Sequence, residues 1–275
     1  MKLLVLGASG MLGRDLVLAA ERAGHEVAAA PRADVDVTDA TAVERAVQGA
    51  RPDWVANCAA YTRVDDAEAE EAEATRVNGG GAGHVARAAA AAGAAALYPS
   101  TDYVFDGTKP DDYLESDPVD PLSAYGRSKL AGERASDGHL VVRTSWLFGT
   151  GGRNFVETML GLAATRDELR VVDDQVGSPT FTGHLAAGLV ELMETGSRGV
   201  RHLSAQGSCT WREFAETIFE RTGTSIRVDG CTTDEFGAPA PRPGRSVLAS
   251  EHPDTPRLAE WTEGLDAYLA ARVPA

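Results

Sequence analysis

Tyr125 and Lys129 stand four residues apart in the stretch SAYGRSKLAGE, residues 123–133. If Ser123 begins a helix, the two side chains lie one turn apart on the same face. A phenol with a pKa near ~10 is a weak acid at neutral pH, but a neighbouring ammonium stabilises the phenolate and lowers that pKa. The spacing therefore predicts a catalytic pair in which Tyr125 donates a proton, although the same spacing also arises by chance between ordinary helix residues.

The choice of lysine at position 129 is itself informative. Lysine occurs at Lys2, Lys109 and Lys129, and the other 23 of the 26 basic residues are arginine. A compact ammonium and a planar guanidinium are not interchangeable in a tight polar site. The lysine therefore favours a specific chemical role for this side chain.

A hydroxyl that could complete the pair occurs upstream, in PSTDYVFDG, residues 99–107. Thr101 follows an apolar run, so we expect it at the carboxyl edge of a sheet, where its hydroxyl can hydrogen-bond an oxygen that gains negative charge. A threonine there is also common in ordinary turns. Together, Thr101, Tyr125 and Lys129 predict the reduction of a carbonyl group, with a proton passing from Tyr125 to the carbonyl oxygen.

A glycine-rich turn precedes these residues and points to the other reactant. GASGMLG, residues 7–13, follows the apolar run KLLVL and has glycines at Gly7, Gly10 and Gly13. The first allows a tight turn, the second lets the backbone approach a pyrophosphate, and the third lets the helix pack closely on the sheet. A strand-to-helix turn can carry glycines without a ligand, but this arrangement predicts a dinucleotide site and hydride transfer from a nicotinamide.

The residues after the second apolar run, 26–30, bear on which dinucleotide is bound. A carboxylate at the end of that strand would favour NAD by holding the ribose hydroxyls, but the chain has Pro31 and Arg32 there. Arg32 can meet the 2′-phosphate of NADP, so we favour NADPH over NADH, with a solvated surface arginine as the alternative. Asp36 and Val37 are expected at the adenine, as a carboxylate for its amino group and an apolar wall.

Short apolar runs alternate with helical patterns through the first half of the chain, and these elements must position the site. We expect strands at 2–6, 26–30, 54–57, 94–100 and 140–143, and helices after the glycine turn, from Thr38 or Asp39 to Val47, and through the alanine-rich stretch 83–93. This alternation indicates an α/β fold, with a Rossmann-type doubly wound parallel sheet and function at the carboxyl ends of its strands.

The pattern becomes less regular after residue 150. We expect residues 1–150 to form an NAD(P)-binding Rossmann domain, with a segment near 175–205 returning to it, and residues 151–275 to form mainly a smaller C-terminal substrate-binding lobe. Within that part we expect helices at 154–164 and 182–194, a strand at 169–172, a capping box at 210–213 and a proline-rich loop at 238–246.

Composition narrows the class of protein. The chain has 275 residues, 43% of them hydrophobic, which is ample for a buried core, and its net charge of −15 argues against nucleic acid as a partner. No apolar run approaches the ~18 residues of a membrane span. Three scattered cysteines, with no CxxC pair and no metal-ligand spacing, predict a reducing compartment and no structural zinc. We therefore expect a cytoplasmic protein without a membrane partner.

Several longer strings make the sequence similar to a known family. The glycine turn, the threonine of STDYVF and YxxxK are marks of the extended short-chain dehydrogenases/reductases. More specific strings, over residues 1 to about 270, resemble the dTDP-4-dehydrorhamnose reductase family: NCAAYTRVDDAE, STDYVFDG, SWLFG, GRNFVETML, VVDDQVGSPT and RPGRSVL. The resemblance implies NAD(P)H-dependent reduction of the 4-keto group of a dTDP-4-keto-6-deoxyhexose, in the leading case dTDP-4-dehydro-L-rhamnose to dTDP-L-rhamnose.

Position by position, the resemblance implies roles for individual residues. Thr101, Tyr125 and Lys129 match the catalytic residues, and the last two also match cofactor contacts. Further cofactor contacts are implied for Gly10, Met11, Leu12, Asp36, Val37, Ala59, Ala60 and Tyr61. Substrate contacts are implied for Thr101, Asp102 and Trp146, with ordinary packing as the alternative for the tryptophan. Candidates to hold the substrate diphosphate are Arg153, Asn154, Arg242 and Arg245, with a surface role as the alternative for each arginine.

The resemblance leaves other points open. Some members use Mg²⁺ at a dimer contact, but no compact acidic cluster here demands a metal, and the acidic run at 65–73 is predicted to be a solvated helix face. The resemblance is consistent with both a monomer and a homodimer. Alternatives to the leading function are a reductase of a related dTDP-4-keto sugar in an antibiotic-sugar pathway, such as a dihydrostreptose-like product, an epimerase or dehydratase of the same superfamily, and a non-catalytic regulatory subunit of this fold. The intact trio argues against the last.

Overall fold

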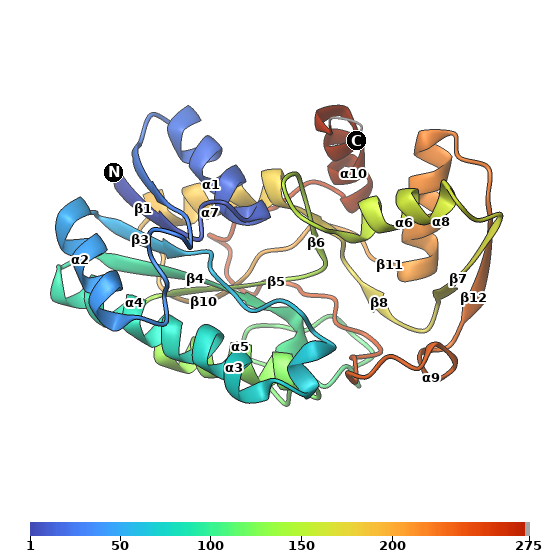
Figure 1. Cartoon of the computed structure of the whole chain (residues 1–275), viewed down its shortest axis with the longest axis horizontal. Helices are drawn as coiled ribbons and strands as arrows, with labels where there is room; N and C mark the ends of the chain where they lie inside the picture. Colours follow the sequence, from blue (N-terminus) through green and yellow to red (C-terminus); the bar gives the residue numbers. More distant parts are fainter. Residues whose placement is uncertain (273–275) are drawn as a thin grey trace.

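A six-stranded parallel sheet forms the centre of the computed structural model, which describes residues 1–272 (Figure 1). The strand order is β10-β5-β4-β3-β1-β2, and every neighbouring pair is parallel. The strands are β1 (Lys2–Leu6), β2 (Glu26–Ala30), β3 (Trp54–Asn57), β4 (Ala95–Thr101), β5 (Leu140–Thr144) and β10 (Gly199–His202). The predicted doubly wound parallel sheet is therefore confirmed.

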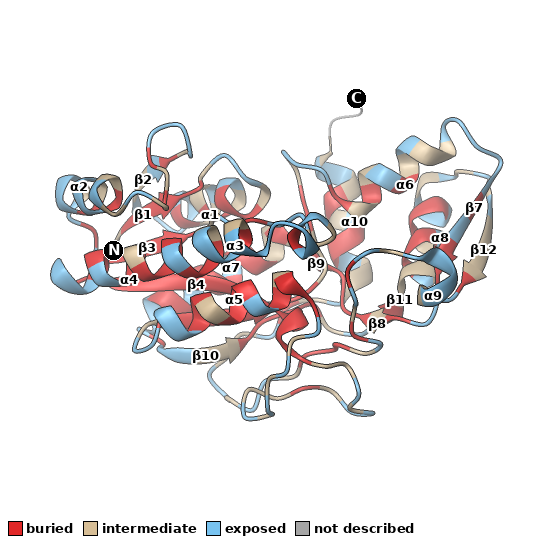
Figure 2. Cartoon of the chain, turned by 60° about the horizontal axis from the view of Figure 1, so that its bottom comes forward, coloured by how far each residue is buried: buried red, intermediate tan, exposed pale blue. Residues whose placement is uncertain are grey.

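Helices cover both faces of the sheet, so its inner strands are buried on both sides and read as continuous apolar runs (Figure 2). One face carries α1 (Met11–Arg22) and α7 (Thr182–Glu194), whose Leu16 and Leu189 are fully buried in a shared core with the sheet. The other face carries α2 (Ala40–Ala50), α4 (Gly81–Ala91) and α5 (Ala124–Ala135). The small side chains of α4 allow it to pack closely, which explains the alanine-rich sequence.

The direction of chain progression reverses beside β1. The chain passes from β1 to β2 on one side and then crosses to β3 on the other. In open parallel sheets, such a reversal leaves a crevice at the carboxyl ends of the two strands that flank it, here β1 and β3. The glycine turn follows β1 and the segment 58–61 follows β3, so the two segments predicted for the cofactor meet at this crevice.

A smaller unit lies beside the carboxyl end of the sheet (Figure 1). It contains α6 (Phe155–Ala163), β7 (Glu168–Val172), α8 (Trp211–Thr222), β12 (Arg227–Cys231) and α10 (Trp261–Ala271). Its apolar core includes Phe148, Phe214 and Tyr268. Because α7 and β10 belong to the sheet layers, residues 182–202 lie with the sheet and not with this unit. The predicted boundary near residue 150 stays a prediction.

The remaining elements are short. Two pairs of two-residue strands connect the units, β6 (Leu147–Phe148) with β9 (Thr180–Phe181) and β8 (Val176–Gly177) with β11 (Cys209–Thr210). The short helices are η1 (Asp66–Glu68), α3 (Glu71–Thr75), η2 (Arg76–Gly80), η3 (Asp102–Val104) and α9 (Thr233–Phe236). The predicted capping box of Thr210 and Glu213 is present. Across residues 1–272, no helix has the length and apolar character needed to cross a membrane.

Candidate active site

The glycine turn brings β1, α1 and the segment after β3 into close contact. Gly7 has a φ of +72°, and a Cβ there would lie 2.6 Å from the backbone nitrogen of Ala59. A Cβ on Gly13 would lie 2.4 Å from the carbonyl oxygen of Gly7, so close packing excludes a side chain at both positions. Gly10 differs, because its nearest contact would be 3.4 Å away. Packing within the protein does not demand glycine at position 10, which fits a backbone left open for an anion at the start of α1.

A cavity of about 180 Å³ lies at this turn. Its walls come from the glycine turn and from the segments that follow β2 and β3: Gly7, Ser9, Gly10, Arg32, Val35, Asp36, Val37, Cys58, Ala59, Ala60 and Val77. Seven residues predicted to contact the cofactor therefore share one cavity. Four lining residues are not among the predicted contacts: Ser9, Val35, Cys58 and Val77, of which only Ser9 and Cys58 lie inside the motifs named above.

Asp36 and Arg32 both line this cavity, but the side chain of Asp36 is held by hydrogen bonds and that of Arg32 is largely exposed. The Oδ1 atom of Asp36 accepts hydrogen bonds from the Thr38 backbone nitrogen at 2.9 Å and from the Thr38 hydroxyl at 2.8 Å, and these bonds lower the pKa of the carboxyl. The side chain of Arg32 is 75% exposed, and its guanidinium lies 3.7 Å from the Asp36 carboxylate. Arg32 is thus held loosely enough to bind a further anion at the cavity.

Three other residues predicted for the cofactor lie beside the cavity instead of in its walls. Met11 and Leu12 are the first residues of α1, and Leu12 is buried in the core on that face of the sheet. Tyr61 is buried, and its phenol donates a hydrogen bond to Glu70 at 2.7 Å. The side chains of Leu12 and Tyr61 are engaged with the protein, so their cofactor contacts stay a prediction.

Helix α5, which carries Tyr125 and Lys129, is capped as predicted by Ser123, whose hydroxyl accepts a hydrogen bond from the Gly126 backbone nitrogen at 3.1 Å. The helix then runs very close to β4, because a Cβ on Gly132 would lie 2.2 Å from the phenolic oxygen of Tyr98. Thr101 is the last residue of β4. This close approach places the helix that carries the predicted pair against the strand that carries the predicted hydroxyl.

Lys129 is buried at the contact between α5 and β4. Its Nζ donates a hydrogen bond to the carbonyl oxygen of Pro99 at 2.6 Å and lies 4.1 Å from the centroid of the Tyr98 ring. Burial lowers the pKa of Lys129 to about 7, while the charges of Glu133 and Cys58 act in the opposite direction. Cys58, which lines the cofactor cavity, is thus close enough to Lys129 to influence its pKa.

Tyr125 lies with Thr101 at the end of β4. Burial raises the pKa of Tyr125 well above its ordinary value, the charge of Asp102 raises it further, and a hydrogen bond with Thr101 lowers it. From the sequence alone, we expect Lys129 to lower this pKa. In the structure the lowering contact comes from Thr101, while the ammonium of Lys129 is directed to Pro99.

Asp102 is buried directly behind Thr101, with 1% of its surface exposed. Its Oδ1 accepts a hydrogen bond from the Thr101 hydroxyl at 3.0 Å, and its Oδ2 accepts one from the Ser246 hydroxyl. Burial raises the pKa of Asp102 to about 7. Since both carboxylate oxygens face protein hydroxyls, the substrate contact proposed for Asp102 stays a prediction. Ser246 was not singled out as a site residue, and only its place in the string RPGRSVL could have indicated it.

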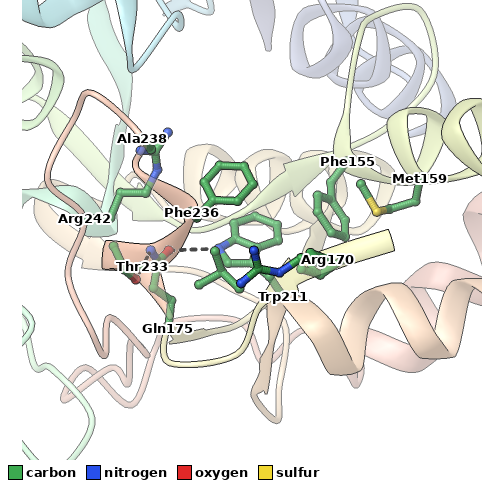
Figure 3. A pocket seen from close by; sticks show the side chains of 11 residues that line it. Phe155, Met159, Arg170, Gln175, Trp211, Thr233, Phe236, Ala238 and Arg242 are labelled. Carbon is green, nitrogen blue, oxygen red and sulfur yellow. Dashed lines mark hydrogen bonds between the residues drawn. The ribbon is translucent and has the colours of Figure 1, made fainter. Parts of the chain in front are cut away.

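A second cavity, of about 240 Å³, lies in the smaller unit (Figure 3). Its lining is mainly aromatic and aliphatic, with a few polar groups, and includes Phe155, Met159, Arg170, Gln175, Trp211, Thr233, Phe236 and Arg242. The polar groups are fixed, since Gln175 accepts a hydrogen bond from the Trp211 indole at 3.1 Å and donates one to the Thr233 hydroxyl at 2.9 Å. A concave apolar wall with a few oriented polar groups suits a flat organic ring.

Arg242 connects this aromatic cavity to the reacting residues. Its guanidinium donates to the carboxylate of Asp65 at 2.9 Å and hydrogen-bonds Tyr103. The ring of Tyr103 stands edge-on to that of Tyr125, with 6.1 Å between the ring centroids. Arg242, which lines the aromatic cavity, is therefore separated from Tyr125 by one side chain, that of Tyr103.

Trp146 is held in an unusual conformation beside the same cavity. Its φ is +47°, and its ring stacks on Trp211 with 3.5 Å between centroids and 5° between planes. On another side the ring meets Gly177, where a Cβ would lie 2.4 Å away. The buried Nε1 of Trp146 has no hydrogen-bond partner among residues 1–272. A strained backbone and an unpaired donor together are typical of a functional position.

Known proteins are similar in sequence to this chain over most of its length. Residues 1–273 match the family model of the RmlD substrate binding domain. A dTDP-4-dehydrorhamnose reductase of Streptomyces griseus is 45% identical over 256 residues, which cover 89% of this chain and 84% of the relative. The chain belongs to the dTDP-4-dehydrorhamnose reductase family. The family predicted from the motifs is thereby confirmed.

Two further relatives of this reductase family bear on substrate and cofactor. A dTDP-4-keto-6-deoxy-D-glucose reductase of Streptomyces niveus is 42% identical over 254 residues, which cover 90% of this chain and 88% of the relative. The crystal structure of a dTDP-4-dehydrorhamnose reductase from Bacillus anthracis in complex with NADP superposes with a TM-score of 0.94 at 38% identity, covering 98% of this chain and 99% of the other.

The four candidates for the diphosphate of a reductase substrate do not converge. Arg242 lines the aromatic cavity, but Asn154 caps α6 by accepting a hydrogen bond from the Glu157 backbone nitrogen at 3.0 Å. Arg153 lines a separate, shallow hollow with Glu157. Arg245 donates to Asp112 at 2.6 Å and lines another cavity. Of the four, the structure therefore brings Arg242 to the aromatic cavity and places the other three elsewhere.

The acidic residues of the run at 65–73 are mostly exposed, as the predicted solvated helix face requires, but two of them also contact α5. The Glu68 carboxylate accepts a hydrogen bond from the Ala124 backbone nitrogen at 2.8 Å, and Glu71 binds the Arg127 guanidinium through bonds of 2.7 and 2.9 Å. Both contacts lie in the first turns of α5, where negative charge is favourable. The run therefore anchors the start of the catalytic helix in this reductase.

One cluster in residues 1–272 has the composition of a cation site. Glu115, Glu251 and His252 each place a ligand atom within 4.8 Å of the others. The Glu115 carboxylate already accepts hydrogen bonds from the His202 backbone nitrogen at 2.8 Å and the Ser250 hydroxyl at 2.6 Å. These bonds account for the position of Glu115, and no predicted site residue belongs to the cluster. The role of Mg²⁺ stays untested.

Proposed function

We propose that this chain reduces the 4-keto group of a dTDP-4-keto-6-deoxyhexose with NADPH, and that its leading substrate is dTDP-4-dehydro-L-rhamnose, which yields dTDP-L-rhamnose. The observation that carries the proposal is the meeting of Thr101, Tyr125 and Lys129 at the carboxyl end of β4, in a chain of this reductase family. Such an arrangement can deliver a proton to a carbonyl oxygen while the adjacent carbon is reduced.

NADPH, when bound, supplies the hydride that goes to C4 of the sugar. The residues of this chain supply the proton and stabilise the charge. Tyr125, whose high pKa keeps it protonated at neutral pH, gives its phenolic proton to the C4 oxygen. Thr101 hydrogen-bonds the phenol, and a protonated Lys129 supplies a buried positive charge on the same helix face.

The cavity at the glycine turn fits the proposed cofactor. The open backbone at Gly10 would receive the pyrophosphate at the start of α1, and Asp36 and Val37 would face the adenine. Arg32, loosely held beside Asp36, would meet the 2′-phosphate and favour NADPH over NADH. The NADP complex of the relative from Bacillus anthracis supports this choice.

The aromatic cavity supports a nucleotide-linked substrate. A thymine ring is flat and carries carbonyl and N–H groups along its edge, so an aromatic wall with a fixed glutamine and threonine suits it. The diphosphate would then pass Arg242 and carry the sugar towards Tyr125. The unpaired Nε1 of Trp146 would donate a hydrogen bond to this part of the ligand.

The proposal is tested with the purified protein, NADPH and dTDP-4-dehydro-L-rhamnose made in situ from dTDP-4-keto-6-deoxyglucose by a 3,5-epimerase. We expect one NADPH to be oxidised per sugar reduced, and NMR of the product to show the C4 configuration of rhamnose. An epimerase or dehydratase of the same superfamily would show no net loss of NADPH. Absence of turnover with both NADPH and NADH would overturn the proposal.

A second candidate is the reduction of a related dTDP-4-keto sugar. The relative from Streptomyces niveus favours it, because its name specifies a D-gluco sugar and its identity to this chain is similar to that of the dehydrorhamnose reductases. Omitting the epimerase from the assay presents that sugar directly. Faster turnover without the epimerase, or an NMR spectrum of another C4 epimer, would favour the second candidate.

We also propose that the enzyme works in the cytoplasm, either as a monomer or as a homodimer. All three cysteines, Cys58, Cys209 and Cys231, are free thiols in the structure, as expected in a reducing compartment. Sedimentation equilibrium with and without Mg²⁺ separates the monomer from a metal-dependent dimer.

A further inference from the structure

A series of hydrogen-bonded side chains runs from the C-terminal part of the chain to the catalytic phenol. Ser246 donates to Oδ2 of Asp102, Oδ1 of Asp102 lies 3.0 Å from the Thr101 hydroxyl, and that hydroxyl lies close enough to Tyr125 to lower the pKa of its phenol. Asp102 and Ser246 are each 1% exposed, and Thr101 is 7% exposed. The carboxylate is therefore shielded from solvent and connected to the reacting phenol through a single hydroxyl.

The hydroxyl of Thr101 limits how protons can be arranged along this series. A hydroxyl offers one hydrogen and two lone pairs. The backbone nitrogen of Tyr103 takes one lone pair of Thr101 Oγ1, at 3.2 Å. The remaining hydrogen and lone pair must serve Asp102 and Tyr125. Thr101 therefore either donates to the Asp102 carboxylate and accepts from Tyr125, or accepts from a protonated Asp102 and donates to Tyr125.

Only the second arrangement leaves the proton of Tyr125 free for a substrate. When Asp102 is ionised, Thr101 donates to it and the phenolic hydrogen is directed to Thr101. When Asp102 is protonated, Thr101 donates to the phenolic oxygen, and the phenolic hydrogen can face the carbonyl. The second arrangement also stabilises the phenolate that remains after proton transfer.

We propose that Asp102 is a positioning residue that must be protonated for Tyr125 to act as an acid, and that it then returns a proton to Tyr125 through Thr101. The inference rests on the proposed reduction. In the return step, the Asp102 O–H bond breaks as its proton moves to Thr101, and the Thr101 proton moves to the phenolate. The products are a neutral Tyr125, an unchanged Thr101 hydroxyl and an Asp102 carboxylate, which takes a proton from water after product release.

The surroundings of Asp102 agree with a carboxyl that changes protonation state. Burial raises its pKa to about 7, against the hydrogen bonds from Ser246 and Thr101, which favour the charged form. The titratable groups that face it are Tyr103 on its own turn and Tyr125 on α5, and its negative charge raises the pKa of both. From the segment after β12, Ser246 faces Asp102 directly, and Arg242 reaches Tyr103. Neutral Asp102 therefore makes Tyr125 the stronger acid.

An infrared titration tests the protonation of Asp102 without any turnover. We expect the difference spectrum between wild type and Asp102→Asn to contain the C=O stretch of a protonated carboxylic acid, which disappears with a midpoint between about pH 6 and 8. An ordinary aspartate would be ionised above pH ~5. Absence of the protonated band above pH 5 would overturn the inference, whatever the outcome for the proposed sugar reduction.

The kinetic test compares Asp102→Asn with wild type across pH 5.5 to 9. We expect the kcat of wild type to fall as Asp102 ionises with rising pH, and the kcat of Asp102→Asn to be at least about ten-fold lower and without this alkaline limb. Asp111→Asn removes a charge from an exposed position and should match wild type. A raised KM with unchanged kcat would mark Asp102 as a substrate contact and would contradict the proposal.

The variant Ser246→Ala retains the Asp102 carboxyl group. It therefore tests the proposal even if Asp102→Asn does not fold. Removing the Ser246 hydrogen bond destabilises the ionised form, so the pKa of Asp102 should rise. We therefore expect the alkaline limb of kcat, and the infrared midpoint, to move to higher pH in Ser246→Ala. A limb and a midpoint that do not move would contradict the connection between Ser246 and Asp102.

Discussion

The ammonium of Lys129 donates a hydrogen bond to the carbonyl oxygen of Pro99 over 2.6 Å, and Pro99 lies two residues before Thr101 on β4. The bond fixes α5 against the strand that ends in the catalytic threonine. Behind it, Glu133 binds Arg143 of β5 through two hydrogen bonds of 2.9 and 2.8 Å. The lysine thus holds α5 in place as well as supplying charge, and a planar guanidinium does not have the geometry of this compact ammonium.

Burial of Lys129 should be visible in the pH dependence of stability. Its pKa is about 7 in the folded protein and near ~10.4 in the unfolded chain, so between these values the unfolded state binds more protons. The contribution of Lys129 to the free energy of unfolding must then rise with pH, by at most about 1.4 kcal/mol per unit. We expect the free energy of unfolding of wild type, measured relative to that of Lys129→Met, to increase from pH 7 to 9 in urea titrations without cofactor.

The half-buried Lys2, which pairs with Glu26 at the surface, provides the control for this measurement. Lys2→Met should differ from wild type by a small amount that stays constant over the same pH range. If the difference for Lys129→Met is also constant, Lys129 is not a buried cation with a lowered pKa.

Arg32 should decide between the two dinucleotides. Loss of a charge-assisted contact to a phosphate is worth about 1.5–3 kcal/mol, or roughly 10- to 150-fold in affinity. We expect Arg32→Ala to raise the KM for NADPH at least about ten-fold and to leave the KM for NADH within about two-fold. Arg45→Ala, an exposed arginine on α2, serves as the control. Equal effects on both cofactors would show that Arg32 does not contact the 2′-phosphate.

Trp211 should contribute mainly to substrate affinity. It stacks on Trp146 and lines the aromatic cavity, so its removal takes away a stacking surface and support for the strained tryptophan. Base stacking is worth about 1–3 kcal/mol. We expect Trp211→Ala to raise the KM for the dTDP-sugar about ten-fold or more, with a smaller change in kcat, and Trp211→Phe to have a milder effect. An unchanged KM in Trp211→Ala, with thermal unfolding as the check of folding, would place the nucleotide elsewhere.

The local signals in the sequence were sufficient for five of the six strands of the sheet, β1 to β5, and did not indicate the edge strand β10. The predicted apolar runs end within one residue of β1 to β5, and Ser123 and Asp39 cap the helices that follow them. These features depend on near neighbours in the chain, which is why periodicity and capping rules predict them.

Contacts between distant segments could not be predicted in the same way. Ser246 and Asp102 are 144 residues apart, and Glu71 and Arg127 are 56 apart. Nothing in the composition of an acidic run or a proline-rich loop indicates which distant backbone or side chain it will meet. The same limit explains why Arg153 and Arg245, chosen because a guanidinium suits a phosphate, lie away from the aromatic cavity that Arg242 lines.

The most direct test of Tyr125 as the proton donor is the rate of NADPH oxidation in a single turnover with dTDP-4-dehydro-L-rhamnose. In Tyr125→Phe the ring and its packing remain while the proton is lost. General acid catalysis is typically worth about 10²–10⁴-fold, so this variant should oxidise bound NADPH at least about 100-fold more slowly than wild type, with the Kd for NADPH unchanged within about two-fold. A rate within about three-fold of wild type would contradict the central claim.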